Sequence, residues 1–298
     1  MKYPGDAGLG ERLAFLYRTS TVNVGEVISD ITYDRSKVTE IVFDNIDELV
    51  ETKKKFEADM AAYKSGERKT KPKLNPPTFL SFIRSPYCVS FDVHGGDKEA
   101  YKPYQFMAVN AHLIYGKSRD RWREFVALME WMRDRVVEEE NMYYPAFILL
   151  GDLNLDYDNP ERDFAKLEEF VKNIDGGTPD EVKVNFPFLE IHPNATKHFT
   201  SNIHLTQRYD QIGLFFRDDD GAYQGLPNKK ENSTMGENEL GPDYGVFNFS
   251  DLFARALKKV DYEELPSSDR KAFSRRYEHE VSDHMPIWIK LKMRGADK

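Results

Sequence analysis

Four short polar motifs stand where apolar runs of this sequence begin or end. They are Asn110-Ala111-His112-Leu113, Gly151-Asp152-Leu153-Asn154, Tyr209-Asp210-Gln211-Ile212 and Ser282-Asp283-His284-Met285-Pro286. Each is a weak signal alone, because a Gly-Asp turn after a strand is common and a lone histidine is more often structural. Together they supply acids, amides and imidazoles from four separate segments, as an acid–base hydrolase requires.

Asp152 and Asn154 form the clearest pair, because they directly follow the apolar run 146–150. Side chains two residues apart in a strand point to the same side, so this carboxylate and this amide are expected to face one site. Carboxylate and amide oxygens suit a hard ion such as Mg²⁺ or Mn²⁺, and the lack of a Cys/His cluster argues against a structural zinc site.

Short apolar runs alternate with amphipathic helical patterns, as expected of sheet layers covered by helices. The clearest predicted strands are 13–17, 106–113, 146–154 and the terminal run 285–293, with a further apolar run after Gln211. One helix is predicted over about 119–140, with an apolar stripe that should face the core. Another begins at Asn159-Pro160, where Asn caps the helix and Pro suits its first turn, and ends before Gly176. The pattern predicts an α/β (α+β) fold.

Residues 48–77 and 218–245 resemble insertions on this frame. The first is a charged helical pattern followed by a Lys-rich loop, and the second is rich in Gly, Asn and Asp without sustained periodicity. The lysines of the first insertion are expected to form a solvated face, with nucleic-acid contact as the alternative. No internal repeat or dividing linker is visible, so residues 1–298 are expected to form a single domain.

The composition limits the class of protein. The net charge of −9 argues against a protein that coats nucleic acid, although an enzyme needs only a local basic rim. No run approaches the roughly 18 apolar residues of a membrane span, and the first residues lack the apolar run of a secretory signal. The single cysteine, Cys88, is expected to be a buried thiol, which fits a reducing compartment. We therefore expect a cytoplasmic chain without membrane contact, unless an upstream segment carries a signal.

Taken in order, the motifs GERxxFLY, FxRxPY, NAHL, GDxN, YDQI and SDHxP resemble those of the endonuclease/exonuclease/phosphatase family, in its DNase-I-like branch. The resemblance runs from Gly10 to Leu291, nearly the whole chain. It implies a two-layer β-sandwich flanked by helices, with the catalytic groups in one cleft at the strand ends. It also implies a hydrolase of phosphoester bonds that depends on Mg²⁺ or Mn²⁺.

The resemblance implies catalytic roles for four residues. Asp152 is similar to the family's aspartate that positions or deprotonates the attacking water, and Asn154 to the amide that hydrogen-bonds the scissile phosphate. His284 is similar to the imidazole that faces the phosphate, with Asp210 as the acid that orients it. Such a carboxylate holds an imidazole in one tautomer and keeps it cationic near neutral pH.

The resemblance also implies metal-binding and phosphate-binding residues, and a second catalytic pair of an imidazole and an acid. Asp283 is similar to a metal-proximal carboxylate, and Asp152 is a second candidate ligand. His112 is similar to the second imidazole of the DNase-I-like branch, with Glu11 as its acidic partner. Arg84, in the motif FxRxPY, is similar to an arginine that contacts a substrate phosphate, for which a planar guanidinium is suited.

Simpler roles stay open for several of these residues. Asp152 alone would serve as a cap for the turn after its strand, Arg84 as a surface ion pair and Glu11 as a solvated residue ahead of a strand. The histidines outside the motifs are expected to be structural or exposed; they are His94, His192, His198, His204 and His279.

The sequence departs from the family pattern at its start. Members begin with a strand that carries an Asn and, after a helix, a strand that ends in a metal-binding Glu, both upstream of the GERxxFLY motif. Only nine residues precede Gly10 here, whereas a strand-helix-strand unit takes about 30. We therefore expect a fold that lacks its first strand-helix-strand unit, with weakened metal affinity and self-association through an open sheet edge.

The motifs narrow the substrate class in part. The segment Arg208-Tyr209-Asp210-Gln211 differs from the Trp-Cys-Asp-Arg motif of the family's phosphoinositide phosphatases, and His112 stands where an abasic-site endonuclease carries a tyrosine. We favour a sequence-nonspecific nuclease with DNA or RNA as its substrate. The alternatives are an inactive family member that acts as a binding module, and a phosphatase or phosphodiesterase that acts on a small phosphoester.

Overall fold

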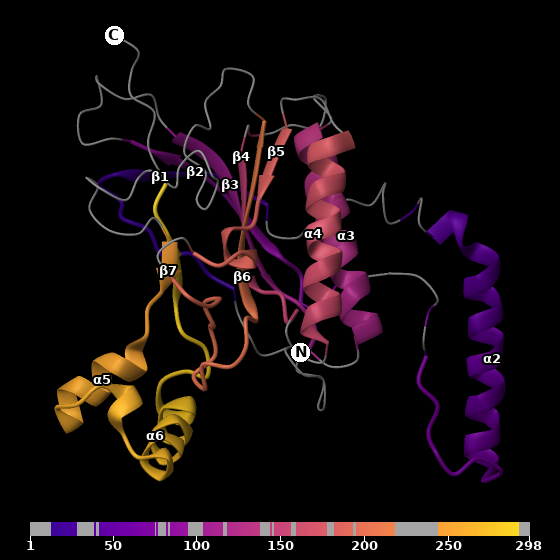
Figure 1. Ribbon diagram of the computed structural model, residues 1–298. Helices are drawn as coiled ribbons and strands as arrows, with labels where there is room; N and C mark the ends of the chain where they lie inside the picture. Colours follow the sequence, from indigo (N-terminus) through magenta and orange to yellow (C-terminus); the bar gives the residue numbers. More distant parts are fainter. Residues whose placement is uncertain are drawn as a thin grey trace.

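A large sheet with helices on one face and a small sheet on the other makes up most of the computed structural model (Figure 1). The structure describes residues 13–28, 39, 42–74, 76, 82, 84–94, 104–115, 118–137, 144, 146–155, 159–177, 182–192, 195–217 and 244–291. This mixed α/β arrangement confirms the fold class predicted from the alternating apolar runs.

The large sheet contains six strands in the order β1-β2-β3-β4-β6-β5. Their bounds are β1 Val22–Ile28, β2 Tyr87–Val93, β3 Tyr104–His112, β4 Ala146–Asp152, β5 Val182–Asn185 and β6 Asp210–Arg217. Neighbouring strands are antiparallel except β3 and β4, which run parallel. A parallel pair needs a crossover connection, and helix α3 (Ser118–Val137) provides it.

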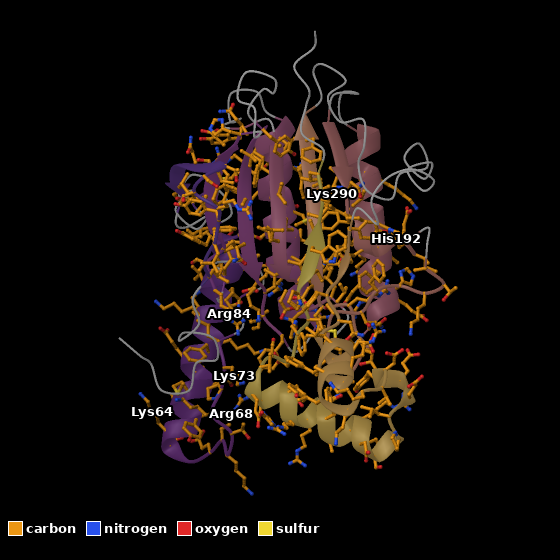
Figure 2. The ribbon with its side chains drawn as sticks, turned by 90° about the vertical axis from the view of Figure 1, so that its left-hand side faces the viewer. Lys64, Arg68, Lys73, Arg84, His192 and Lys290 are labelled. Atoms are coloured by element: carbon orange, nitrogen blue, oxygen red, sulfur yellow. The ribbon has the colours of Figure 1, made fainter. Side chains whose placement is uncertain are left out.

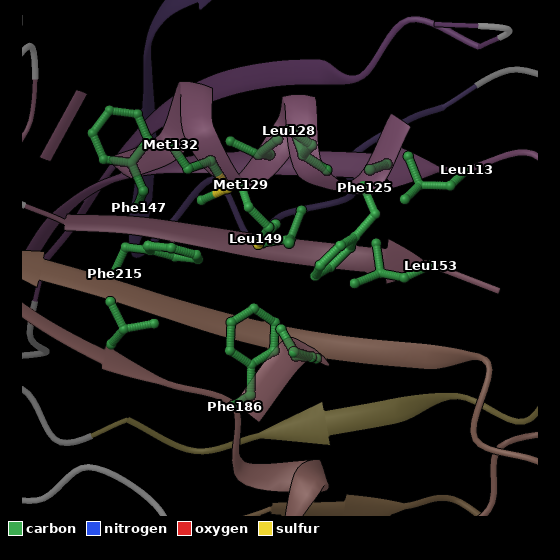
Figure 3. Close-up of a cluster of buried hydrophobic side chains, with 14 of the residues drawn as sticks. Leu113, Phe125, Leu128, Met129, Met132, Phe147, Leu149, Leu153, Phe186 and Phe215 are labelled. Carbon is green, nitrogen blue, oxygen red and sulfur yellow. The ribbon is translucent and has the colours of Figure 1, made fainter. Parts of the chain in front are cut away.

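Helices α3 and α4 (Pro160–Gly177) cover one face of this sheet and form its larger core (Figure 3). Successive strand residues point to opposite faces, so Met107 of β3 and Leu149 of β4 meet the helices. The apolar stripe predicted for α3 is fully or almost fully buried against them: Phe125, Met129, Met132 and Val136. Burial of such side chains contributes roughly 1.5–3 kcal/mol each.

Helix α4 begins as the sequence predicts. The Asn159 side-chain oxygen accepts a hydrogen bond from the backbone N of Arg162 at 3.1 Å, and Pro160 occupies the first turn. The helix continues to Gly177, so the predicted end before Gly176 was slightly early.

The opposite face of the sheet is covered by strands β7 (Tyr244–Val246) and β8 (Ile287–Ile289), which pair with each other. Tyr244 packs in one cluster with Ile148 of β4 and Leu214 of β6. The predicted two-layer sandwich is therefore formed over the β4–β6 half of the large sheet. Strand β8 is shorter than the predicted run 285–293, of which residues 292 and 293 lie outside the described residues.

The strand predicted at 13–17 is not formed. These residues have no regular structure, and the strand that pairs with β2 is β1, further along the chain. Phe15 instead packs against the rings of Tyr87 and Phe91, with ring centroids 5.6 and 5.4 Å apart. The apolar character of this run comes from covering a sheet face, not from pairing within the sheet.

A small helical lobe follows β7. Helix α5 (Phe249–Lys258), the short helix η5 (Tyr262–Glu264) and helix α6 (Ser267–Glu280) enclose a third core cluster, which includes Phe273 and Met285. Figure 1 shows α5 and α6 beyond the end of β7. Helix α6 leads directly into the Asp283-His284 motif.

The structure describes most of the first predicted insertion, and the second is described only at residues 244–245. Helix α2 (Ile46–Ser65) stands apart from the sheet in Figure 1, has no buried residue and is followed by an irregular Lys-rich segment, as predicted. Figure 2 shows Lys64, Arg68 and Lys73 in this part of the molecule. Residues 218–243 of the second insertion lie outside the described residues.

Two features of the described part of the chain relate to the composition. No helix there has both the length and the apolar character needed to cross a bilayer. Cys88 lies on β2, faces the helices and is buried, as expected.

Candidate active site

Three neighbouring strands of the large sheet bring polar motifs together at one end. His112 of β3 lies opposite Asp152 of β4, and Asp152 lies opposite Asp210 of β6. Adjacent strands are about 5 Å apart, so the register alone makes these three residues neighbours. Three of the four motifs therefore meet because of sheet pairing.

The turn after β4 has a constrained backbone. Gly151 has φ +146°, and a Cβ there would lie 1.8 Å from the backbone oxygen of Ala111, so only glycine fits. Asn154 has φ 52°, a left-handed conformation that Asn adopts more readily than most residues. Its side-chain nitrogen donates to the backbone oxygen of Leu113 at 2.9 Å, and its backbone N donates to Asp152 Oδ1 at 2.9 Å.

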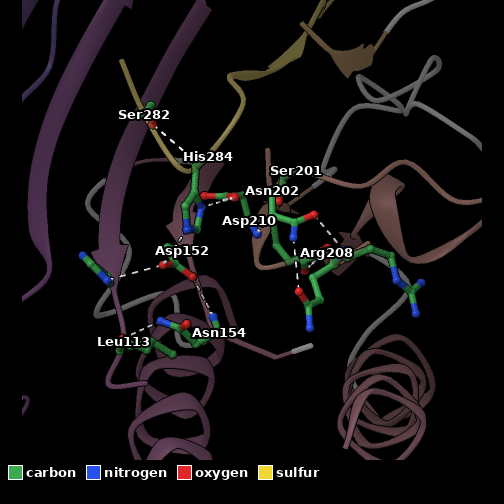
Figure 4. Close-up of polar contacts among 12 residues, drawn as sticks. Leu113, Asp152, Asn154, Ser201, Asn202, Arg208, Asp210, Ser282 and His284 are labelled. Carbon is green, nitrogen blue, oxygen red and sulfur yellow. Dashed lines mark hydrogen bonds and ion pairs between the residues drawn. The ribbon is translucent and has the colours of Figure 1, made fainter. Parts of the chain in front are cut away.

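His284 completes the site from the loop after α6 (Figure 4). Its Nδ1 lies 2.7 Å from Asp210 Oδ2, a hydrogen bond, and its Nε2 lies 3.9 Å from Asp152 Oδ2. On the other side, His112 Nε2 lies 3.4 Å from the same Asp152 oxygen. Two imidazoles therefore flank one carboxylate.

Residues 201–207 hold the loop that carries His284. The backbone oxygen of Ser201 accepts from the backbone N of Met285 at 2.6 Å, and its hydroxyl accepts from the backbone N of Asp210 at 3.1 Å. Ser201 thus fixes both members of the His284–Asp210 pair, a role that the sequence motifs do not reveal.

The environment raises the pKa of Asp152 from 3.8 to about 7. Burial is the main cause, and repulsion from the Asp210 carboxylate adds to it. Attraction to His284, the hydrogen bond from the backbone of Asn154 and the charge of Arg84 oppose the rise. Asp152 is therefore a carboxylate that becomes a proton acceptor close to neutral pH.

The pKa of His284 moves in the same direction for a different reason. Burial by itself lowers the pKa, but the hydrogen bond that His284 donates to Asp210, the charge of Asp210 and those of Asp152 and Asp283 together outweigh burial and raise the pKa from 6.5 to about 9. Between about pH 7 and 9, Asp152 is negative while His284 is positive. A carboxylate that can accept a proton and an imidazolium cation then lie side by side.

A cavity of about 550 Å³ opens over these groups. Its volume lies within the range of small-molecule sites. It is lined by Arg84, His112, Tyr115, Asp152, Asn154, Tyr209, Asp210, Asp283 and His284. The structure thus brings together every site residue named from the sequence except Glu11, which lies outside the described residues.

Two tyrosines of this cavity were not singled out from the sequence. The Tyr209 ring lies 5.5 Å from the His284 ring between centroids, and Tyr115 also lines the cavity. Tyr209 directly precedes Asp210 and Tyr115 follows the NAHL motif by two residues, so proximity to the motifs was the signal available.

The cavity offers oxygen ligands but no complete cluster. Among the residues described, no three or more His, Cys, Asp or Glu side chains are arranged to hold a metal ion. Asp152, Asp210 and Asp283 nevertheless line one cavity, and two of these carboxylates repel each other strongly enough to shift a pKa. Bringing a cation to such carboxylates would relieve that repulsion.

No protein-family model matches the chain, and no curated protein sequence matches it. Solved structures with a detected likeness include an endonuclease/exonuclease/phosphatase family protein from Bacteroides thetaiotaomicron, with 12% identity, a TM-score of 0.29 and coverage of 66% of this chain and 53% of that one. A mannosyl-6-phosphatase from the same organism shows 13% identity, a TM-score of 0.31 and coverage of 66% and 54%. The human Nocturnin catalytic domain with bound sulfate shows 12% identity, a TM-score of 0.28 and coverage of 46% and 44%. The chain spans about half the length of these structures.

Proposed function

We propose that the chain is a phosphodiester hydrolase. The observation that supports this proposal is one buried carboxylate flanked by two imidazoles: Asp152 lies 3.4 Å from His112 and 3.9 Å from His284. Arg84 lines the same cavity and suits a phosphate group. Phosphodiester hydrolysis needs a positioned water, cations near the phosphoryl oxygens and a proton for the leaving oxygen, and these residue types supply all three.

Each side chain has a distinct role in this proposal. Asp152 accepts the proton of the attacking water, for which a pKa of about 7 is well placed. His284, kept cationic by Asp210, binds a phosphoryl oxygen or protonates the leaving oxygen. The side-chain amide of Asn154 donates one N–H to the backbone oxygen of Leu113, and its second N–H is the donor proposed for the phosphate.

A hard divalent ion is part of the same proposal. Asp152 and Asp283 would hold Mg²⁺ or Mn²⁺, because Mg²⁺ usually keeps several waters and needs only one or two carboxylates. When bound, such an ion neutralises charge on the phosphoryl oxygens.

For the substrate we favour nucleic acid over a small phosphoester. Five exposed cations gather in the last turn of α2 and in the segment after it, in a chain whose net charge is −9: Lys64, Arg68, Lys69, Lys71 and Lys73. A local basic surface of this kind attracts a polyanion even when the whole protein is acidic. Figure 2 shows Lys73 and Arg68 below Arg84 in that view.

Hydrolysis assays test the function directly. We expect the purified protein to cleave plasmid DNA, single-stranded DNA, RNA or bis-(p-nitrophenyl) phosphate in Mg²⁺ or Mn²⁺, and to stop when EDTA is added. His284→Ala and Asp152→Ala should each lower turnover at least about 100-fold, the lower end for loss of an acid–base or electrostatic group.

His279→Ala is the matched control, because His279 is exposed on α6 close to the site in sequence. It should leave turnover nearly unchanged. Cleavage that persists in EDTA, or a larger loss in His279→Ala than in His284→Ala, would contradict the proposed mechanism. Binding of nucleic acid without cleavage would favour the binding module instead.

A further inference from the structure

A second cavity, of about 310 Å³, lies between the helical lobe and residues 195–205. Lys197 and His204 line it from one side, and Arg270 and Lys271 of α6 from the other. It shares no lining residue with the catalytic cavity. Four basic side chains from separate segments therefore converge on a space of their own.

Most of the basic side chains in this cavity have no ion-pair partner in the described part of the chain. Within the described part of the chain, Lys197, Arg270 and Lys271 form no ion pair, whereas Arg255 and Arg276 of the same lobe pair with Asp261 and Glu280. Glu263 is the one acidic residue in the lining, and His204 lies 3.7 Å from Glu278. The lining thus keeps a surplus of positive charge in a chain whose net charge is −9.

Hydrogen-bond donors accompany these charges. Ser267, the first residue of α6, lines the cavity, and no side chain caps the N-terminus of this helix. The N–H groups of a first helical turn attract anions and add to the three cations. At the wall of the cavity, the hydroxyls of Tyr262 and Ser274 hydrogen-bond each other, so the wall is held in place without using the cations.

We propose that this cavity is a second phosphate-binding site. Three cations and the donors of a helix N-terminus suit a tetrahedral dianion, and the volume lies at the lower end of small-molecule sites. The phosphate belongs either to a free phosphorylated ligand or to a polyanionic substrate. In the second case it is a phosphate group far from the bond that the protein hydrolyses. Residues 201–207 link the site to the loop that carries His284, because the backbone N of Ile203 donates to the backbone oxygen of Asp283 at 2.8 Å.

Binding of inorganic phosphate in EDTA tests the site without any need for turnover. The measurement uses isothermal titration calorimetry with Arg84→Gln/His284→Ala, which removes phosphate contacts in the catalytic cavity. We expect this protein to bind phosphate, and the added triple change Lys197→Gln/Arg270→Gln/Lys271→Gln to raise Kd at least about tenfold, as for loss of charge-assisted hydrogen bonds.

A matched triple change controls for net charge. Lys258, Arg275 and Lys290 are exposed and lie outside the cavity, so their change to Gln removes the same three charges. This control should leave Kd within about twofold, and thermal melts should show that all variants fold. An equal rise in Kd for both triples, or no phosphate binding at all before the triple changes, overturns the proposal.

Kinetics on the otherwise wild-type protein then identify the source of the phosphate. If the phosphate belongs to a polymeric substrate, the cavity triple raises KM for an oligonucleotide at least about tenfold and leaves KM for bis-(p-nitrophenyl) phosphate unchanged. If the phosphate belongs to a free ligand, the triple change at Lys197, Arg270 and Lys271 weakens phosphate binding but leaves KM for both the oligonucleotide and bis-(p-nitrophenyl) phosphate unchanged. A protein without hydrolytic activity would contradict the proposed function but leave the calorimetric result intact.

Discussion

Asp152 is held in surroundings that oppose its own charge. Burial and the neighbouring Asp210 raise the pKa of Asp152 to about 7, so the folded protein at neutral pH pays a free-energy cost to keep it ionised. Catalytic groups are often held in such unfavourable states, because the same state makes them reactive. The cost can be measured through stability, separately from turnover.

We predict that Asp152→Asn stabilises the folded protein at pH 8 in EDTA. A carboxyl whose pKa rises on folding makes the native state bind more protons than the unfolded chain between pH 3.8 and about 7, so stability falls as pH rises through that window. An asparagine side chain has no charge, so the variant avoids this loss of stability, and its side-chain oxygen still accepts the hydrogen bond from the backbone N of Asn154. The thermal midpoint should rise by a few degrees at pH 8 and converge with wild type near pH 4.

Asp152→Ala provides the control for this prediction. It also removes the charge, but it leaves the backbone N of Asn154 without its acceptor, so it should stabilise less than the Asn variant. An Asn variant that melts below wild type at pH 8 would mean that the ion pair with His284 outweighs the cost of burial.

The His284–Asp210 pair gives a second prediction at the scale of single residues. Asp210→Asn should lower the pKa of His284 from about 9 by at least about one unit, because the hydrogen bond to Asp210 and the charge of Asp210 are the largest causes that raise this pKa. Since the folded pKa lies above the unfolded value of 6.5, the stability gained from the charged imidazole is complete below pH 6.5 and is lost through pH 9. Histidine ring NMR on metal-free protein measures this pKa, and an unchanged titration in the variant would assign the shift to another group.

The sequence predicted the residues that line the candidate active-site cavity better than the residues that hold those side chains in place. Asp152, Asp210 and His284 are recognisable because acids and imidazoles stand out at the ends of apolar runs. Tyr115 gave no such signal, because an aromatic residue after a strand fits a core equally well. Ser201 acts through contacts with two other segments, which only the folded chain reveals. The pairing of His112 with Glu11 stays a prediction.

At the scale of elements, the site depends on the close approach of the parallel strands β3 and β4. The register places Ala111 opposite Gly151, immediately before the pair His112 and Asp152. Any side chain at Gly151 would force these two strands apart where the catalytic side chains meet. The glycine of the GDLN motif is therefore as important to the site as its acid.

We predict that Gly151→Ala destabilises the protein by more than about 3 kcal/mol, since its Cβ would overlap the Ala111 backbone oxygen and its φ is unsuited to alanine. Gly66→Ala is the matched control: φ at Gly66 is +84°, but a Cβ there meets nothing within 4 Å. It should cost only about 1 kcal/mol, from the left-handed backbone alone. Urea unfolding measures both, and equal costs would show that the strands can separate without penalty.

Periodicity predicted some elements well and others poorly, for reasons that differ. Strand β4 and helix α3 have long, regular apolar patterns, and both form close to the predicted bounds. Strand β1 was missed because its run Val22–Ile28 contains polar and glycine positions, whereas the more apolar run 13–17 was taken for the strand. Apolar character does not specify strand pairing: in the run 13–17, Phe15 packs on the sheet face while Leu16 is fully exposed.

At the scale of the whole molecule, the described residues form two separate apolar clusters on the face of the large sheet opposite the helices. Strands β7 and β8 pack over β4 and β6, whereas Val89, Phe91 and Ala108 form a separate cluster over β2 and β3. Phe15 packs on that cluster, but Leu16 beside it is fully exposed. In the part of the fold that is described, β8 pairs with β7 alone.

We predict that the protein self-associates reversibly through the exposed Leu16 on this face and the edge of β8, because exposed apolar side chains and unpaired strand groups both favour pairing with another chain. Trp288→Lys places a charge on β8, where the Trp288 side chain is 37% exposed, and should shift the protein toward monomer in sedimentation velocity. Leu257→Lys is the control, since Leu257 is exposed on α5 outside this face and should leave association unchanged. A wild-type protein that stays monomeric from micromolar to near-millimolar concentration would contradict this prediction. The sheet edge would then have no part in assembly.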